Sequence, residues 1–133
     1  MSAAHFSIET GERCALIPIT DLVRGAVADS GLEDGICAVF VPHTTAGVLI
    51  NENADPDVVL DVLGWFSREV PLDPRFRHAE GNSDAHIKAI LAGSSVSIPV
   101  SQGELELGTW QGIYFAEFDG PRRRRFTVSC IAD

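Results

Sequence analysis

Hydrophobic residues along this chain follow two different periods, and each period predicts its own kind of element. Residues 36–41 and 113–118 are apolar at nearly every position, which indicates strands buried on both faces. Apolar and polar residues alternate in S-V-S-I-P-V at 95–100, which is typical of a sheet with one face in water. The chain is therefore rich in short strands, and further ones are expected at 48–51, 105–107 and 126–130.

The N-terminal region predicts a β-hairpin followed by a helix. Residues 3–8 and 14–19 are strand-like, and the turn T-G-E-R lies between them. Thr20 or Asp21 is expected to cap a short helix that Ser30 and Gly31 end, since glycine is the common residue after a helix C-terminus.

The clearest helical pattern begins after Asp55, which is expected to be the N-cap. Proline occupies the first helical position, where its missing N–H costs nothing. Apolar residues then recur at helical spacing and predict one stripe that packs on a sheet, and Pro71 ends the helix. Together the elements predict one α+β domain over residues 1–133, with seven or eight short, mainly antiparallel strands and two or three helices.

Composition and charge limit the function classes. A net charge of −9 argues against general nucleic-acid binding, which relies on neutralising phosphates. No apolar stretch reaches the length of a membrane span, and the N-terminus has no secretory signal. We therefore expect a cytoplasmic protein with reduced, buried cysteines at positions 14, 37 and 130. A phosphate ligand would need local positive charge.

The stretch H-A-E-G-N-S-D-A-H-I-K at 78–88 is the strongest candidate site. Its G-N-S turn leads into a helix expected at 84–92, with Asn82 or Ser83 as the N-cap. The unpaired N–H groups and the dipole at a helix start favour an anion. The stretch therefore combines metal-binding side chains with a place for a negatively charged group.

Three of the four histidines are candidates for one metal site. His78 and His86 lie in this stretch, and His43 follows the strand at 36–41. Each histidine alone has an ordinary alternative, as a surface or capping residue, and the eight-residue spacing matches no standard zinc motif. Taken together with the nearby carboxylates, the three imidazoles suit a transition metal.

Asp84 has two interpretations that the sequence leaves open. On a regular helix Asp84 and His86 point in different directions, so they converge only if Asp84 lies in a loosely wound first turn. Alternatively, Asp84 is a first-turn charge that complements the helix dipole and pairs with Lys88 four residues later.

The arginines at 122–125 invite a phosphate-binding interpretation. If this run enters the last strand, successive side chains point to opposite faces and do not form one patch. Solvated charges at a sheet edge are then the favoured interpretation, although one of the four arginines can still bind a phosphate through two hydrogen bonds. In the loop G-T-W-Q-G at 108–112, Trp110 is expected in the core or an interface. Gln111 either orients a ligand or satisfies the turn.

Four motifs in order along the chain resemble those of the YjbQ-like family, whose members are often described as secondary thiamine-phosphate synthases. They are H-T-T-A-G at 43–47, N-E-N-A-D-P at 51–56, the stretch at 78–88, and S-x-x-I-x-V-x-x-G-x-x-x-x-G-T-W-Q-x-I at 95–113. The resemblance implies a β-sandwich that assembles as a homotrimer, with a site near the subunit boundary. It also implies roles for particular residues: His43, His78 and His86 as metal ligands, Asp84 and His86 as catalytic residues, and Asn82, Lys88 and Gln111 as substrate- or phosphate-binding neighbours.

The resemblance further implies an enzyme that joins a hydroxymethylpyrimidine diphosphate to a thiazole phosphate and releases pyrophosphate. A divalent metal, zinc-like or magnesium, would assist. Two alternatives use the same residues: a trimer that binds a metal or an anion and has only incidental synthase activity, and a metal-assisted phosphoester hydrolase.

Overall fold

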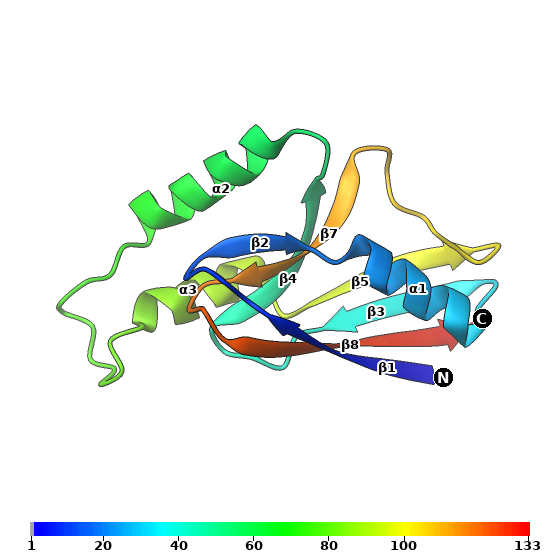
Figure 1. Cartoon of the computed structure of the whole chain (residues 1–133), viewed down its shortest axis with the longest axis horizontal. Coiled ribbons are helices and arrows are strands. Elements are labelled where there is room, and N and C mark those ends of the chain that lie inside the picture. Colours follow the sequence, from blue (N-terminus) through cyan, green and yellow to red (C-terminus); the bar gives the residue numbers. More distant parts are fainter. Residues whose placement is uncertain (1) are drawn as a thin grey trace.

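The strands form two antiparallel sheets in the computed structural model, which describes residues 2–133 (Figure 1). The five-stranded sheet has the order β1-β8-β3-β5-β6, and the three-stranded sheet has the order β2-β7-β4. The strands of the first sheet are β1 (Ser2–Glu9), β8 (Arg123–Ala132), β3 (Gly35–Phe40), β5 (Ser95–Ser101) and β6 (Glu104–Leu105). Those of the second are β2 (Ala15–Pro18), β7 (Gln111–Glu117) and β4 (Ala46–Glu52).

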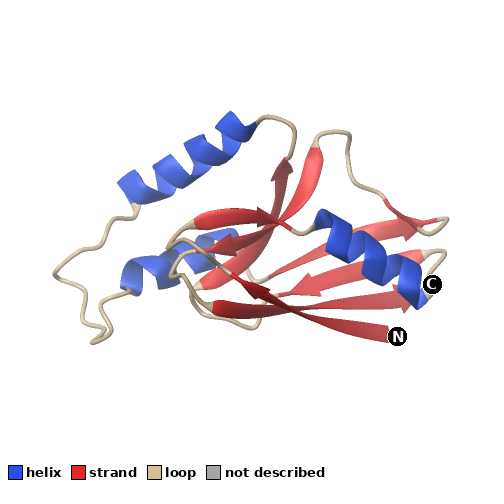
Figure 2. Ribbon diagram, in the orientation of Figure 1, coloured by secondary structure: helices blue, strands red, loops and turns tan. Residues whose placement is uncertain are grey.

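Three helices complete the fold: α1 (Thr20–Ser30), α2 (Pro56–Glu69) and α3 (Ser83–Ala92). Figure 2 shows α2 at the periphery, joined to α3 by the long loop at residues 70–82. None of the helices in the described part of the chain has the length and apolar character needed to cross a membrane. The predicted α+β sandwich of mainly antiparallel strands is confirmed.

The main core lies where the two sheets face each other. Strands β3, β5 and β8 supply one side of it, β4 and β7 supply the other, and α1 closes it with Val23 and Val27. The predicted central strand is confirmed, because β3 lies between β5 and β8. Its side chains alternate, however: Cys37 and Val39 are buried, while Ile36 and Phe40 are about half exposed. The core residues fully or almost fully buried in these elements include Val48, Ile98, Ile113, Phe115, Phe126 and Val128.

Strand β7 is buried on both faces, as its continuous apolar pattern predicts. Ile113 and Phe115 point into the main core. On the opposite face, Ala116 and the adjoining Phe118 pack against Ala85 and Ala89 of α3, with Phe66 of α2 at the edge. Both faces are therefore covered within one chain, so this strand by itself does not require a partner subunit.

The predicted N-terminal hairpin is wrong. Strand β1 pairs with β8, with Phe6 opposite Phe126, whereas β2 pairs with β7 in the other sheet. The turn between them is instead tied to distant residues: the Thr10 amide donates to the Arg122 carbonyl at 2.9 Å. Long-range burial of β1 on the main core therefore outweighs the local turn signal.

Local helix signals are more accurate. Asp55 caps α2 by accepting from the Asp57 amide at 2.9 Å, and Gly31 ends α1 in the left-handed conformation with φ 74°. Thr20 does not cap α1, because its hydroxyl accepts from the Ile113 amide at 2.9 Å and so ties the helix start to β7.

Candidate functional site

Three segments that are distant in sequence bring their histidines to one pocket. His43 comes from the β3–β4 loop, His78 from the loop before α3, and His86 from α3 itself. The pocket holds about 390 Å³ and is called the histidine pocket below. Its lining residues are Pro42, His43, Thr44, Thr45, His78, Glu80, Asn82, His86, Arg122 and Arg124.

The topology explains why these segments meet. Between β3 and β4 the chain crosses from one sheet to the other, and between β7 and β8 it crosses back. Both crossings occur at the same end, since Ala46 at the start of β4 pairs with Glu117 at the end of β7. Figure 1 shows this end opposite the two chain termini, with the first turn of α3 beside it.

The three imidazoles have different surroundings. The rings of His78 and His86 meet edge to face with centroids 5.3 Å apart, and His78 Nε2 lies 4.0 Å from a Glu80 carboxylate oxygen. His43 Nε2 accepts from the Arg125 amide at 3.0 Å, so the neutral ring carries its proton on Nδ1. Burial and the nearby arginines lower the pKa of His43, which is therefore neutral at pH 7.

The chemistry of these side chains fits a transition metal better than their arrangement does. Imidazole nitrogens beside a carboxylate are suitable zinc-like ligands. Within residues 2–133, however, no three His, Cys, Asp or Glu side chains are close enough to hold a metal ion. His43 would first have to release the Arg125 amide. The three-histidine metal site therefore stays a prediction, although its members do share one pocket.

Arg124 and Glu117 form a buried ion pair behind the histidine pocket. Arg124 Nε lies 2.9 Å from Glu117 Oε1, and Arg124 Nη2 lies 2.5 Å from Glu117 Oε2. The same Nη2 donates to the Thr45 hydroxyl at 2.9 Å, and the Thr10 hydroxyl donates to Glu117 Oε1 at 2.7 Å. Burial alone would raise the pKa of Glu117, but these hydrogen bonds outweigh it and hold the pKa below its ordinary value.

Asn82 occupies the N-cap position of α3, but its side chain does not cap the helix. Its Nδ2 donates instead to the carboxylates of Asp119 at 2.7 Å and Glu80 at 3.2 Å. Two carboxylate partners fix which end of the amide is the nitrogen. Asn82 Oδ1 is then the one buried side-chain polar atom without a hydrogen-bond partner in the described part of the chain.

Asp84 lies outside the histidine pocket, on the inner side of α3. Its carboxylate accepts two hydrogen bonds from Arg13, at 3.0 and 3.1 Å, and one from Lys88 Nζ at 3.1 Å. Desolvation would raise the pKa of Asp84, but the two cations outweigh it and lower the pKa. The pairing with Lys88 that the sequence allowed is therefore present, and it directs Asp84 away from His86.

Gln111 is also distant from the histidine pocket within a single chain. It begins β7 opposite Glu52, whereas Glu117, beside the pocket, ends the strand. Six residues of extended strand separate Gln111 from Glu117 by about 20 Å. Gln111 Oε1 accepts from the Gly108 amide at 2.8 Å and so satisfies the turn. Trp110 beside it is 64% exposed rather than part of this chain's core.

A second hollow adjoins the histidine pocket. It holds about 380 Å³ and shares His43, Thr44 and His86 with the pocket. Its other walls are mostly small or apolar, from Ala46, Ala89, Ile90, Gly93 and Ser94. His43 and His86 therefore stand between a charged space and a less polar one.

Comparison with known proteins places the chain in a family. The family model described as UPF0047 protein YjbQ-like matches residues 4–133. The chain belongs to the YjbQ-like family. It is 52% identical over 128 residues to a UPF0047 protein of Methanocaldococcus jannaschii, covering 96% of this chain and 93% of that protein. It is 48% identical over 118 residues to the UPF0047 protein YugU of Bacillus subtilis, covering 88% and 89% of the two chains.

Solved structures agree with this assignment. A YjbQ/UPF0047 family protein from Clostridium acetobutylicum matches with 53% identity and a TM-score of 0.94, over 96% of this chain and 99% of that one. A YbjQ-like protein from Sulfolobus solfataricus matches with 32% identity and the same TM-score of 0.94, over 99% and 97% of the chains. The fold is thus retained at much lower sequence identity.

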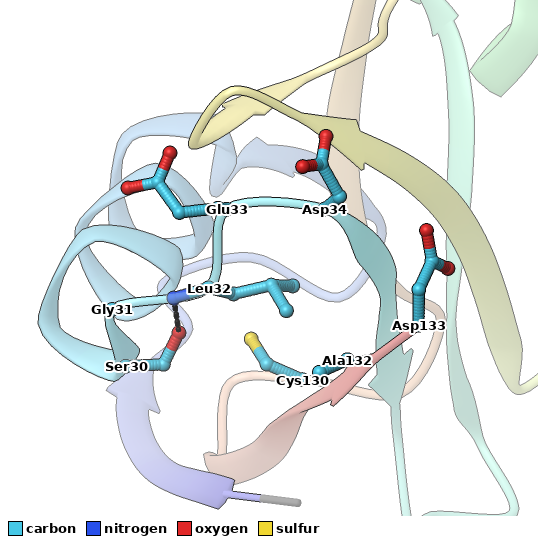
Figure 3. Close-up of a pocket in the computed structure, with 8 residues that line it drawn as sticks. All are labelled: Ser30, Gly31, Leu32, Glu33, Asp34, Cys130, Ala132 and Asp133. Atoms are coloured by element: carbon cyan, nitrogen blue, oxygen red, sulfur yellow. Dashed lines mark hydrogen bonds between the residues drawn. The ribbon is translucent and has the colours of Figure 1, made fainter.

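Another hollow in this YjbQ-like fold, of about 590 Å³, does not suit a phosphate ligand. It lies where α1 and β8 end, near the chain termini, and Figure 3 shows the carboxylates of Glu33, Asp34 and Asp133 around it. Its lining, as far as the structure describes it, holds no basic side chain. Three carboxylates would repel an anion.

The sequence did not identify Arg124 and Glu117, the buried ion pair that lies behind the histidine pocket. Arg124 lay in the run interpreted as edge charges, and Glu117 lay in a strand interpreted as apolar. In the structure β8 is an inner strand of its sheet rather than an edge strand. A signal was present, because Arg124 has the same parity in β8 as the buried Phe126 and Val128. Arg13 is 71 residues from Asp84, and no local pattern connects them.

Proposed function

We propose that this protein is a metal-dependent enzyme that acts on a small phosphorylated molecule in the histidine pocket. The observation that carries the proposal is the meeting of three histidines from separate segments with Arg122 and Arg124 in one pocket. Imidazoles bind metals and move protons near neutral pH, and guanidinium groups bind phosphate oxygens. The groups that phosphate chemistry requires are therefore close together.

The charge around the pocket supports a role for a metal ion. Glu80 lines the pocket, and Glu117 and Asp119 bind its two arginines. With neutral histidines, three carboxylates against two guanidinium groups leave one negative charge. A divalent cation would reverse that sign and favour a phosphate, which the protein's overall charge of −9 otherwise repels.

The ion would be held by His78 and His86, with His43 as a third ligand after its ring leaves the Arg125 amide. Nitrogen ligands favour a zinc-like ion over magnesium, which prefers oxygen. When bound, such an ion supplies Lewis-acid stabilisation of a phosphate oxygen.

The chain's own residues would share the remaining work. His86 lies between the two hollows, and the ring nitrogen that does not hold the ion can hold or transfer a proton. Asn82 belongs to the phosphate-binding part of the pocket, and the adjoining hollow has room for the rest of the substrate. Asp84 and Lys88 would act indirectly, by fixing the first turns of α3. Gln111 would contribute only from a neighbouring subunit.

For the reaction, the family resemblance favours thiamine-phosphate synthesis. The bond between the pyrimidine methylene carbon and the diphosphate oxygen breaks, and its electron pair leaves with pyrophosphate. The thiazole nitrogen forms the new carbon–nitrogen bond. The arginines of the pocket would stabilise the charge on the departing pyrophosphate.

A second candidate reaction is hydrolysis of a phosphoester. It is favoured by the imidazole-rich set of side chains, because nitrogen-held zinc-like ions activate water, whereas pyrophosphate chemistry normally uses magnesium held by oxygens. It requires one phosphorylated substrate rather than two.

An activity assay with controlled metal content tests the proposal. Protein stripped with a chelator and then supplied with Zn²⁺ or Mg²⁺ is expected to form thiamine phosphate and pyrophosphate from the two precursors. Release of inorganic phosphate from one precursor alone would favour the hydrolase instead. Metal binding without either product would contradict an enzyme and favour a metal- or anion-binding protein.

Metal affinity should depend on pH and on the pocket histidines. Binding requires neutral imidazoles, so affinity should fall as the pH drops below about 6.5, the ordinary histidine value. Calorimetry should show this fall, and His86→Ala should lower the bound metal per chain. His5→Ala, on the exposed face of β1, is the matched control. Unchanged stoichiometry in both His43→Ala and His86→Ala would contradict the metal site.

We also propose a homotrimer, on the basis of the family resemblance and of the apolar surface left exposed on one chain. Light scattering should give three times the chain mass, and a monomeric mass at micromolar concentration would refute the trimer. The exposed apolar residues in the region of α2, α3 and the loop before β7 are Leu60 (65%), Trp65 (49%), Ile90 (79%), Leu91 (57%) and Trp110 (64%).

We also propose a cytoplasmic location, which the sequence predicts from the cysteines.

A further inference from the structure

We propose that Arg124 is the residue that positions an anion in the histidine pocket, and that this anion carries a hydrogen-bond donor of its own. The inference rests on the proposed function and narrows its ligand class. It selects monohydrogen phosphate, or a phosphate ester with a hydroxyl beside it, over a fully deprotonated tetrahedral anion such as sulfate. Two groups that have no hydrogen-bond partner support the inference: one is a donor and the other is an acceptor.

The donor is the remaining terminal nitrogen of Arg124. Nε and Nη2 are occupied by Glu117 and Thr45, while Nη1 has no hydrogen-bond partner in residues 2–133. Arg124 is only 5% exposed, yet Nη1 is not among the buried atoms that lack a partner. Nη1 therefore reaches open space, and the space that Arg124 lines is the histidine pocket.

The neighbouring arginines are less suitable. Arg122 also lines the pocket, but its side chain is 48% exposed and already bound to Asp119 through Nε and Nη2. Arg123 and Arg125 are exposed on the opposite face of β8 from Arg124. Arg124 alone of the four is held rigid on two sides, so it loses little side-chain freedom when it binds a ligand.

The acceptor is Asn82 Oδ1. Asn82 is 6% exposed, lines the histidine pocket, and has Nδ2 fixed by Glu80 and Asp119. Oδ1 itself has almost no exposed surface in the free protein, so a ligand donor would reach it as the pocket adjusts on binding. Such a donor would remove the cost of leaving a buried amide oxygen unpaired. Monohydrogen phosphate offers an anionic oxygen to Arg124 and a P–OH to Asn82. Sulfate offers only acceptors and would leave Asn82 unpaired.

Titration with inorganic phosphate and with sulfate, on protein first supplied with Zn²⁺ or with Mg²⁺, tests both halves of the inference. Calorimetry should show that the wild-type protein binds phosphate about tenfold more tightly than sulfate, or better. Arg124→Lys keeps a cation for Glu117 but leaves no nitrogen for the ligand, so phosphate affinity should fall about tenfold. Arg123→Lys makes the same change on the outer face and should leave the affinity unchanged.

A second measurement covers the case in which Arg124→Lys does not fold. In the NMR spectrum of the wild-type protein, phosphate should shift the Nε–H signal of Arg124 and leave that of Arg123 in place. Phosphate binding without a shift at Arg124 would overturn its role and leave the proposed function standing. Equal affinities for phosphate and sulfate would overturn the role of Asn82. Absence of both anion binding and turnover would instead refute the proposed function itself.

Discussion

Replacing Glu117 with alanine should lower the free energy of unfolding by about 3–5 kcal/mol, the usual cost of removing one partner from a buried ion pair. Glu117 is 0% exposed and Arg124 is 5% exposed, so the guanidinium left behind would have no water to replace the lost carboxylate. The Thr10 hydroxyl and the Asp119 amide would lose their acceptor as well. Denaturant unfolding measures the change. Glu106→Ala, at an exposed site, should stay within about 0.5 kcal/mol of the wild type.

The same variant should reveal the pH dependence of this ion pair. The pKa of Glu117 in the folded protein lies below its ordinary value of 4.5. Its stabilising contribution is therefore complete above about pH 4.5 and is lost as the pH falls through the lower folded value. The stability difference between wild type and Glu117→Ala should shrink in that acidic range. A difference that stays constant from neutral pH to pH 3 would show that the carboxylate charge is not responsible.

Replacing His86 with alanine should reduce turnover by about a hundredfold or more, if the ring holds the metal or transfers a proton in the transition state. His86 is one of the two histidines that face both hollows. The thermal unfolding midpoint shows whether the fold is intact. His5→Ala is again the matched control and should retain full activity.

Asp84→Asn provides the comparison for this result. Asp84 bonds Arg13 and Lys88 rather than any residue of the pocket, so its substitution should act through the position of α3 and lower stability together with activity. If His86→Ala and Asp84→Asn both keep full activity with the fold intact, the chemistry lies elsewhere and a binding protein becomes the better interpretation.

The sequence predicts well those structural features that depend on residues close together in the chain. The start of α2 depends on Asp55 and the proline after it, and both act within one helical turn. The fold class follows from the change of hydrophobic period. Strand pairing depends instead on contacts across the whole chain, such as Phe6 opposite Phe126, and a local turn signal at residues 10–13 gave the wrong partner.

The candidate site was predictable to a similar extent. The histidines were found because they are few and lie in compact motifs, and the structure brings all three to one pocket. Asp84 and Gln111 were also expected in the site, but they lie outside the histidine pocket. The spacing of residues in the sequence does not determine the direction in which a side chain points. The burial of Arg124 could have been predicted from the sequence, because strand alternation places it on the buried face with Phe126. A buried arginine requires a carboxylate, and Glu117 stands in the apolar strand that supplies one.

Crystals of the protein soaked in Zn²⁺ and inorganic phosphate, measured at the zinc absorption edge, test the central claim most directly. The anomalous map should place the ion in the histidine pocket, with ring nitrogens of His78 and His86 about 2.0–2.1 Å away and phosphate on the side of Arg124. A pocket without metal or phosphate, with zinc found only at the carboxylates of Glu33, Asp34 and Asp133, would contradict it.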